Sequence, residues 1–302
     1  MCREHTLNTV SGVKFMNAFA YDRLIRILSA AKNLGNPSHV LLKRMFAKNS
    51  DIMTVVDRKT GVRCRCTLGS HHAFATTWYS RDYDVPGVPI RPGDVVIDIG
   101  ANQGFFTCYA ASKGANVYAF EPCPTNYERL LQNVKQNGFD DRVVARPWAI
   151  TDHAGSINVM VSQEMGGAMT TTIPNFAENA RITVIETVTA PCYTFPQVLE
   201  QFSLGQVRVC KIDAEGAELQ ILSQLDPNRF PSIDSFVMEY HVEAYTLAEL
   251  ISLLLGWGTY QVSFMDEKPF TGNVLRAVAN RVLLGETSRP DEHNLQESTS
   301  VK

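Results

Sequence analysis

No stretch of this sequence is apolar for long enough to cross a lipid bilayer. A membrane-spanning helix requires about 20 mainly apolar residues, and the apolar stretch at residues 250–255 is far shorter. The N-terminal residues 1–5 also lack the apolar core of a secretory signal peptide. We therefore expect a cytoplasmic protein without stable insertion in a membrane.

The sequence also has no excess of basic residues. The 302-residue chain has a formal net charge of −3, so it lacks the positive footprint that nucleic-acid-binding domains usually carry. Its seven cysteines are odd in number and scattered, which favours reduced thiols in a cytosol over a disulfide framework. We expect no nucleic-acid partner, and one large domain or a domain with an accessory segment.

The dinucleotide fingerprint Gly-x-Gly-x-x-Gly is absent from the main glycine-bearing turn. Residues 95–99 form an apolar, β-branched run that is typical of a buried strand, and a helix is expected from Phe105. Between them, Gly100 and Gly104 stand four residues apart, and the strand ends in the carboxylate of Asp98. A helix N-terminus presents free N–H groups to a ligand, and a nearby acid suits a cationic or hydroxyl-bearing ligand better than a pyrophosphate.

The next predicted strand, residues 116–120, ends in Glu121 and Pro122. An acid at the end of the second strand can accept both hydroxyls of a ribose. A nucleoside with a positive group satisfies both acids, which describes S-adenosyl-L-methionine. Trp148 either stacks on its adenine or packs in the core. The expected cofactor contacts are Asp98, Gly100, Ala101, Asn102, Gly104, Glu121, Pro122, Trp148, Ala149 and Asp213.

Residues 1–90 are expected to form an extension of helices and one β-hairpin. Helical spacing of apolar residues predicts a helix at 14–31 and a second helix from Pro37, as flanking elements or, alternatively, as amphipathic membrane-surface helices. The hairpin pairs 53–56 with 62–68 across a turn, and its alternation points Cys64 and Cys66 inward. A helical segment with adjacent histidines follows at 71–79.

Residues 91–285 are expected to alternate strands with helices, which predicts an α/β, doubly wound, mostly parallel sheet. The tail 286–302 is polar and is predicted to be disordered. The expected strands are 95–99, 116–120, 142–150, 156–161, 181–189, 206–213, 235–241 and a closing hairpin of 259–264 with 274–282. The expected helices are 105–111, 124–137 with Leu130, Leu131 and Val134 inward, 195–202, 219–225 and one opened by the capping box at Thr246.

Two motifs carry a resemblance to a known family. The segment Gly93-Asp94-Val95-Val96-Ile97-Asp98-Ile99-Gly100-Ala101-Asn102-Gln103-Gly104 and the segment Lys211-Ile212-Asp213-Ala214-Glu215-Gly216-Ala217-Glu218 resemble the FkbM family of S-adenosylmethionine-dependent methyltransferases, over about residues 93–282. The resemblance implies the seven-stranded, Rossmann-like class I methyltransferase fold and methylation of hydroxyls of sugars, glycans or secondary metabolites. At Tyr193-Thr194-Phe195-Pro196 the sequence departs from the Leu-Asp pair that is more frequent in the family.

Asp213, Glu239 and His241 all fall at the C-terminal ends of predicted strands, where ligands bind in this type of sheet. Methyl transfer to a hydroxyl benefits from a general base. His241 is the first choice because the unperturbed pKa of histidine is close to neutral, Glu239 would orient it or bind the acceptor, and Asp213 is an equally plausible base. These three could also hold a divalent ion, but we expect no metal.

The expected partner is a small-molecule or glycan hydroxyl acceptor, and a homo-oligomer is possible. The alternatives are an RNA ribose methyltransferase, a nicotinamide-dependent oxidoreductase and a catalytically idle scaffold.

The glycine turn predicts the effect of one substitution. Gly100→Val should abolish cofactor binding while the fold largely survives, because the new side chain would occupy the ligand's space.

Overall fold

The computed structural model describes residues 34–38, 40, 48, 50–162, 164, 169–226, 232–264 and 274–285. Within them lies a seven-stranded sheet with the order β14-β15-β13-β11-β3-β4-β5. Its strands are β3 (Val95–Ile99), β4 (Asn116–Phe120), β5 (Val143–Arg146), β11 (Val209–Ile212), β13 (Ser235–Glu239), β14 (Tyr260–Phe264) and β15 (Val274–Ala279). The predicted doubly wound sheet with seven strands is therefore confirmed.

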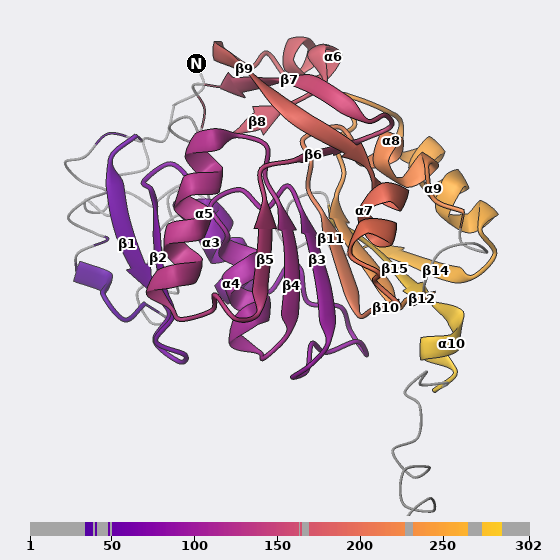
Figure 1. The fold of residues 1–302 in the computed structure, drawn as a ribbon, viewed down its shortest axis with the longest axis horizontal. Coiled ribbons are helices and arrows are strands. Elements are labelled where there is room, and N and C mark those ends of the chain that lie inside the picture. The colour runs from indigo at the N-terminus through magenta and orange to yellow at the C-terminus, as the bar shows by residue number, and fades with distance from the viewer. Residues whose placement is uncertain are drawn as a thin grey trace, which may run out of the picture.

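The sheet is parallel except at one end. β3, β4, β5, β11 and β13 run parallel to their neighbours, whereas β15 lies antiparallel between β13 and β14. The four residues of β11 are all buried, as expected for a strand covered on both faces. The C-terminal ends of the parallel strands consequently meet at one edge of the sheet (Figure 1).

The predicted strand 142–150 is wrong in its extent, because it is two strands in different sheets. β5 ends at Arg146, and after Pro147 and Trp148 the chain forms β6 (Ala149–Thr151), which pairs parallel with β9 (Val184–Thr194). Proline lacks the N–H that a continuing ladder needs. β9 also pairs antiparallel with β7 (Gly155–Ser162), and β7 with β8 (Thr170–Thr171).

This second sheet, with the order β6-β9-β7-β8, lies across the top of Figure 1, above the C-terminal edge of the central sheet. The predicted strand 206–213 is also divided. β10 (Gln206–Val207) pairs with β12 (Ser232–Ile233), and β11 begins only at Val209. The predicted strand 235–241 ends at Glu239, so Tyr240 and His241 lie beyond it.

Helices cover both faces of the central sheet and create two cores. α4 (Phe105–Ser112) and α5 (Pro124–Gln136) pack in one core, and α7 (Phe195–Gln201), α8 (Glu218–Ser223) and α9 (Leu247–Gly256) pack in the other. The capping box at Thr246 is confirmed. Leu130 and Val134 of α5 are buried as expected, but Leu131 is 43% exposed, because i and i+1 positions of a helix point in different directions. Two further short helices are α6 (Pro174–Asn179) and α10 (Asn280–Leu283).

The described part of the N-terminal extension packs against helices of the central sheet. The predicted hairpin is confirmed as β1 (Ile52–Val56) with β2 (Arg63–Thr67), and Cys64 and Cys66 are fully buried in the same core as α4 and α5. The side chain of Asn133 on α5 bonds the backbone of Arg65 in both directions. The hairpin is therefore continuous with the core and is not a separate folding unit.

The predicted helical segment at 71–79 is confirmed as α3 (His71–Ala75) running into a π-helical turn, η1 (Thr76–Ser80). The predicted helix at 14–31, most of the one from Pro37 and the predicted disordered tail lie outside the described residues. Within the described residues, no helix has the length and apolar character needed to cross a membrane.

Candidate active site

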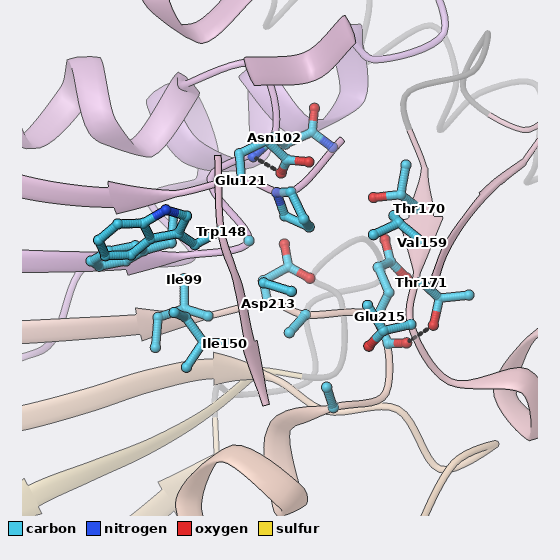
Figure 2. Close-up of a pocket in the computed structure, with 17 residues that line it drawn as sticks. Ile99, Asn102, Glu121, Trp148, Ile150, Val159, Thr170, Thr171, Asp213 and Glu215 are labelled. Carbon is cyan, nitrogen blue, oxygen red and sulfur yellow. Dashed lines mark hydrogen bonds between the residues drawn. The ribbon is translucent and has the colours of Figure 1, made fainter. Parts of the chain in front are cut away.

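An open cavity, whose empty space of about 550 Å³ includes part of the surrounding solvent, lies at the C-terminal edge of the parallel strands, between the central sheet and the second sheet. We call it the first cavity. Trp148 and Ile150 lie at one side of Figure 2, Glu121 and Asn102 at the top, and Thr170 and Thr171 of β8 at the other side. It is lined by Ile99, Gly100, Asn102, Phe120, Glu121, Pro122, Trp148, Ala149, Ile150, Val159, Thr170, Thr171, Thr172, Asp213, Ala214, Glu215 and Ala217.

Of the predicted cofactor residues, the first cavity brings together Gly100, Asn102, Glu121, Pro122, Trp148, Ala149 and Asp213. Asp98, Ala101 and Gly104 do not line it. Asp98 is fully buried, where its carboxylate accepts a hydrogen bond from Thr107 at 2.6 Å and pairs with Lys211 at 3.2 Å. Asp98 therefore lies behind the wall of the cavity, where it pairs with Lys211. Its position does not support the predicted contact with the ligand.

The turn between β3 and α4 depends on glycine for packing. Gly100 has φ +70°, and a Cβ there would stand 1.8 Å from the carbonyl oxygen of Asp213. Valine at position 100 would thus collide with the backbone at the end of β11, and the expectation that the fold would survive Gly100→Val is wrong. Gly104, with φ +82°, lies against Leu130 of α5, to which a Cβ would come within 3.1 Å.

Glu121 is held rigidly at the end of β4. Its two carboxylate oxygens accept the backbone N–H groups of Asn102 at 2.8 Å and Cys123 at 2.9 Å, the first of which is drawn in Figure 2. Burial raises the pKa of Glu121 to about 7, although these two hydrogen bonds and the charge of Lys211 partly oppose the rise. A carboxylate has about four acceptor positions, so room remains for two further donors such as ribose hydroxyls.

An apolar wall closes one side of the first cavity. Trp148 packs against Tyr193 with ring centroids 4.3 Å apart, and against Phe120 at 6.1 Å. Trp148 packs against the core and also lines the cavity, so its core packing is confirmed and its stacking on adenine stays a prediction. On the opposite side, the hydroxyl of Thr171 donates to the carbonyl of Glu215 at 2.7 Å, which ties the second sheet to the loop after β11.

A second open cavity, whose empty space of about 720 Å³ also includes solvent, adjoins the first and shares Asn102, Asp213 and Glu215 with it. We call it the second cavity. Its other walls come from η1, α4 and the strand ends that carry Lys211 and Glu239. The lining residues are His72, Ala73, Thr76, Thr77, Asp82, Tyr83, Ala101, Asn102, Phe105, Phe106, Lys211, Asp213, Glu215, Glu239 and Val274. Two non-glycine residues with left-handed backbones, Asn102 (φ 51°) and Glu215 (φ 50°), stand where the cavities meet, and such strain is concentrated at functional sites.

His241 is clamped between two glutamates. Its Nδ1 lies 3.1 Å from Glu218 and its Nε2 lies 3.3 Å from Glu215. Burial favours the neutral ring, but the charge of Glu218 and hydrogen bonds to both glutamates outweigh it and raise the pKa of His241 to about 12. The imidazole is therefore protonated near neutral pH and lacks the lone pair that a general base needs. This environment argues against the first-choice base, and His241 lines neither cavity.

Glu239, unlike His241, has a pKa that suits a general base. Burial, followed by the negative charge of Asp213, raises the pKa of Glu239 to about 8. Its carboxylate lies in the second cavity, where the phenol of Tyr83 lies within hydrogen-bonding distance of both Glu239, at 3.4 Å, and Asp213, at 3.2 Å. A carboxyl group whose pKa lies near the working pH is suited to proton transfer.

A metal could be held by a different set from the one that the sequence suggested. Among the described residues, Asp213, Glu215 and His241 each place one ligand atom within 4.8 Å of the others, so that Glu215 replaces Glu239. His241 already pairs with two glutamates there. The arrangement is complete as an ion-pair network without an added cation.

Sequence reasoning missed three residues of the site as contributors, Tyr83, Glu215 and Glu218. Glu215 and Glu218 belong to the motif after β11, so the motif itself could have identified them. Glu218 fixes that loop by accepting the N–H groups of Ala214 and Gly216. Tyr83 lies 130 positions from Asp213 in the chain, and no sequence signal connects them.

A doubly wound sheet closed by an antiparallel hairpin, with acids at the ends of β4 and β11 around a cavity, defines the class of S-adenosylmethionine-dependent methyltransferases. The family model of the methyltransferase FkbM domain matches residues 98–260. Because this match covers more than half of the chain, the protein belongs to the FkbM methyltransferase family. It is a methyltransferase with the class I fold.

Known relatives are similar at moderate identity. A 31-O-demethyl-FK506 methyltransferase FkbM from Streptomyces tacrolimicus is 27% identical over 231 residues, which are 66% of this chain and 85% of that protein. A hexuronic acid methyltransferase AglP from Haloferax volcanii is 26% identical over 162 residues, 53% of this chain and 62% of that protein. The solved methyltransferase FkbM from Methylobacillus flagellatus aligns with a TM-score of 0.45 and 13% identity, over 86% of this chain and 60% of that one.

Proposed function

We propose that this methyltransferase transfers a methyl group from S-adenosyl-L-methionine to a hydroxyl oxygen of a small-molecule or glycan acceptor. One relative supports an oxygen acceptor, since it is named for a 31-O position. The observation that carries the proposal is the pair of adjoining cavities, with Glu239 facing only the second of them.

The side chains that line the first cavity suit S-adenosyl-L-methionine in polarity and charge. Its apolar side, made by Phe120, Trp148 and Ile150, suits an adenine, and Glu121 offers free acceptor positions for a ribose. The polar side contains the carboxylates of Asp213 and Glu215, which suit the cofactor's ammonium and sulfonium charges. When bound, this cofactor supplies an electrophilic methyl group.

The second cavity would hold the acceptor. Ionised Glu239 would remove the proton from the acceptor hydroxyl, and Tyr83 would keep that carboxylate and Asp213 in place through its phenol. Aligning the oxygen for an in-line displacement provides much of the rate enhancement in such a transfer. His241 would have a structural role, as the cation that pairs with Glu215 and Glu218.

Two measurements test this function. Calorimetry with S-adenosyl-L-methionine and with S-adenosylhomocysteine should give dissociation constants in about the micromolar range. Labelled methyl transfer should then be screened against glycosides, hydroxylated polyketides and RNA, and we expect products only with the first two. Absence of cofactor binding would contradict the proposed function, and methylation of RNA alone would replace the acceptor class.

A further inference from the structure

Four buried polar side chains connect the glycine turn after β3 to the start of α3. We call Thr67, Ser70, Gln103 and Asn133 the buried polar cluster, and all four are fully buried. They come from β2, the residue before α3, the glycine turn and α5. Polar groups that are buried this deeply are held by hydrogen bonds. The bonds of the cluster therefore fix these four parts of the chain relative to one another.

Gln103 is at the centre of this cluster. Its side-chain carbonyl accepts the N–H of Thr67 at 3.1 Å, and its amide nitrogen donates to the hydroxyls of Ser70 at 3.0 Å and Thr67 at 3.4 Å. Both donors of the amide are thus in use. Asn133 donates to the backbone carbonyl of Gln103 at 2.7 Å. The side chain of Gln103 is consequently fixed in the direction of the N-terminal extension.

The backbone of Gln103 is connected to the first cavity. Its N–H donates to the side-chain oxygen of Asn102 at 2.8 Å, and the N–H of Asn102 donates to Glu121 at 2.8 Å. Asn102 lines both cavities and has a left-handed backbone, with φ 51°. A ribose bound to Glu121 would therefore restrain the turn at the residue directly before Gln103.

The other end of the Gln103 side chain meets a wall of the second cavity. Ser70 directly precedes α3, and we call residues 71–80, which form α3 and η1, the α3–η1 wall. Its members that line the second cavity are His72, Ala73, Thr76 and Thr77. Phe74 of the wall packs edge-on against Phe105 of α4, with ring centroids 6.0 Å apart. Because helices this short are marginal alone in water, the wall depends for its stability on contacts with the turn and α4.

We propose that Gln103 is a positioning residue that makes the stability of the α3–η1 wall depend on occupancy of the first cavity by the cofactor. This inference rests on the proposed function, which assigns the cofactor to the first cavity and the acceptor to the second. A ligand that binds only the folded form of a segment stabilises it by mass action. That stabilisation extends to the elements that open together with the segment. The acceptor would therefore meet a stable wall only after the cofactor has bound.

Amide hydrogen exchange followed by mass spectrometry measures this dependence without a known acceptor. Exchange is compared with and without S-adenosylhomocysteine, at about 100 times the dissociation constant that calorimetry gives for each variant. In the wild type, we expect the ligand to slow exchange at least about tenfold both in the turn, residues 98–108, and in the wall, residues 71–80. Ligand at this concentration can slow a coupled opening by up to about 100-fold.

Two substitutions distinguish positioning by Gln103 from a general loss of stability. Gln103→Met keeps the length of the side chain but removes its three hydrogen bonds. The ligand should still slow exchange in the turn of this variant, whereas the slowing in the wall should be less than about twofold. Asn137→Leu is the matched control, because it also removes three hydrogen bonds, two of them to Arg63 of the same hairpin, and contacts none of the side chains of the cluster. It should keep the full effect of the ligand on the wall.

Ser70→Ala removes the hydroxyl that accepts from Gln103. It should show the same loss as Gln103→Met, and it serves if that variant does not fold. Unchanged slowing of the wall in Gln103→Met, or an equal loss in Asn137→Leu, would overturn the inference. Binding that slows exchange in the wild-type turn but not in the wall would overturn this inference alone. Absence of calorimetric binding to the wild type would instead contradict the proposed function, and the inference with it.

Discussion

The ionisation of Glu239 gives the most decisive prediction about this enzyme. If Glu239 is the base, only its ionised form is active, so the rate must rise with pH through its pKa of about 8. One pH unit below the pKa about one-tenth of the carboxyl groups are ionised, and one unit above it about nine-tenths are. The value of kcat/KM for the cofactor, which reports the free enzyme, should therefore rise about tenfold between pH 7 and pH 9.

The profile separates Glu239 from His241. A carboxyl group with its ordinary pKa of 4.5 would give a flat rate in this range, and a histidine with its ordinary pKa of 6.5 would give a rise that is complete before pH 8. His241 with a pKa of about 12 would give a rate that continues to climb well above pH 9. A midpoint close to pH 8 therefore points to Glu239.

Substitution provides the second half of the test. Glu239→Gln keeps the side-chain shape but cannot accept the proton, so turnover should fall by roughly 10²–10⁴-fold and the rise with pH should disappear. Cofactor affinity should change little, because Glu239 does not line the first cavity. Glu243→Gln, at an exposed position nearby, is the matched control. Near-normal turnover of Glu239→Gln with an unchanged pH profile would refute this reasoning.

Three further predictions concern the cofactor site and its support. Glu121→Gln should weaken cofactor binding by about 1–3 kcal/mol in calorimetry through lost charge-assisted bonds; equal affinity would contradict the role of this acid. Gly100→Ala should lower the melting temperature far more than Gly138→Ala, since both have positive φ (+70° and +67°) but only the former meets backbone atoms; equal shifts would contradict this. The pKa of His241 is raised from its ordinary value of 6.5 to about 12 in the folded protein. The protonated imidazole therefore contributes its full share to the free energy of unfolding below pH 6.5, and this contribution is lost as the pH rises toward 12. In urea unfolding from pH 7 to 10, the wild type should therefore lose up to about 1.4 kcal/mol per pH unit relative to His241→Gln, and parallel curves would rule this out.

The buried pair of Asp98 and Lys211 illustrates how a motif residue can act indirectly. The sequence placed Asp98 beside the ligand because it ends the strand before the glycine turn. In the structure it is fully buried and holds Lys211, whose ammonium also bonds the carbonyl of Gly100 at 2.7 Å. The acid of the first motif thus joins the ends of β3 and β11, and through them it shapes both cavities.

Local pattern was sufficient for much of the fold. The apolar run at Val95–Ile99, the alternation of Cys64 and Cys66 and the capping box at Thr246 each predicted the element that forms there. These signals are carried by neighbouring residues, because burial on one or two faces sets the period of apolar side chains along an element. Glu121 was found for the same reason, since the end of a strand is visible in the sequence.

Tertiary structure decided the properties that depend on distances between remote residues. The sequence predicted His241 as the base from the ordinary pKa of histidine. In the structure, Glu218 at the start of α8, at 3.1 Å, and Glu215 on the preceding loop, at 3.3 Å, keep it protonated. The sequence predicted that a side chain at Gly100 would collide with the ligand, but the nearest obstacle is the carbonyl of Asp213, just beyond the end of β11. Electrostatic and van der Waals interactions weaken over a few ångströms. The protonation state of a side chain, or the space available to it, is therefore determined only when the fold brings such groups together.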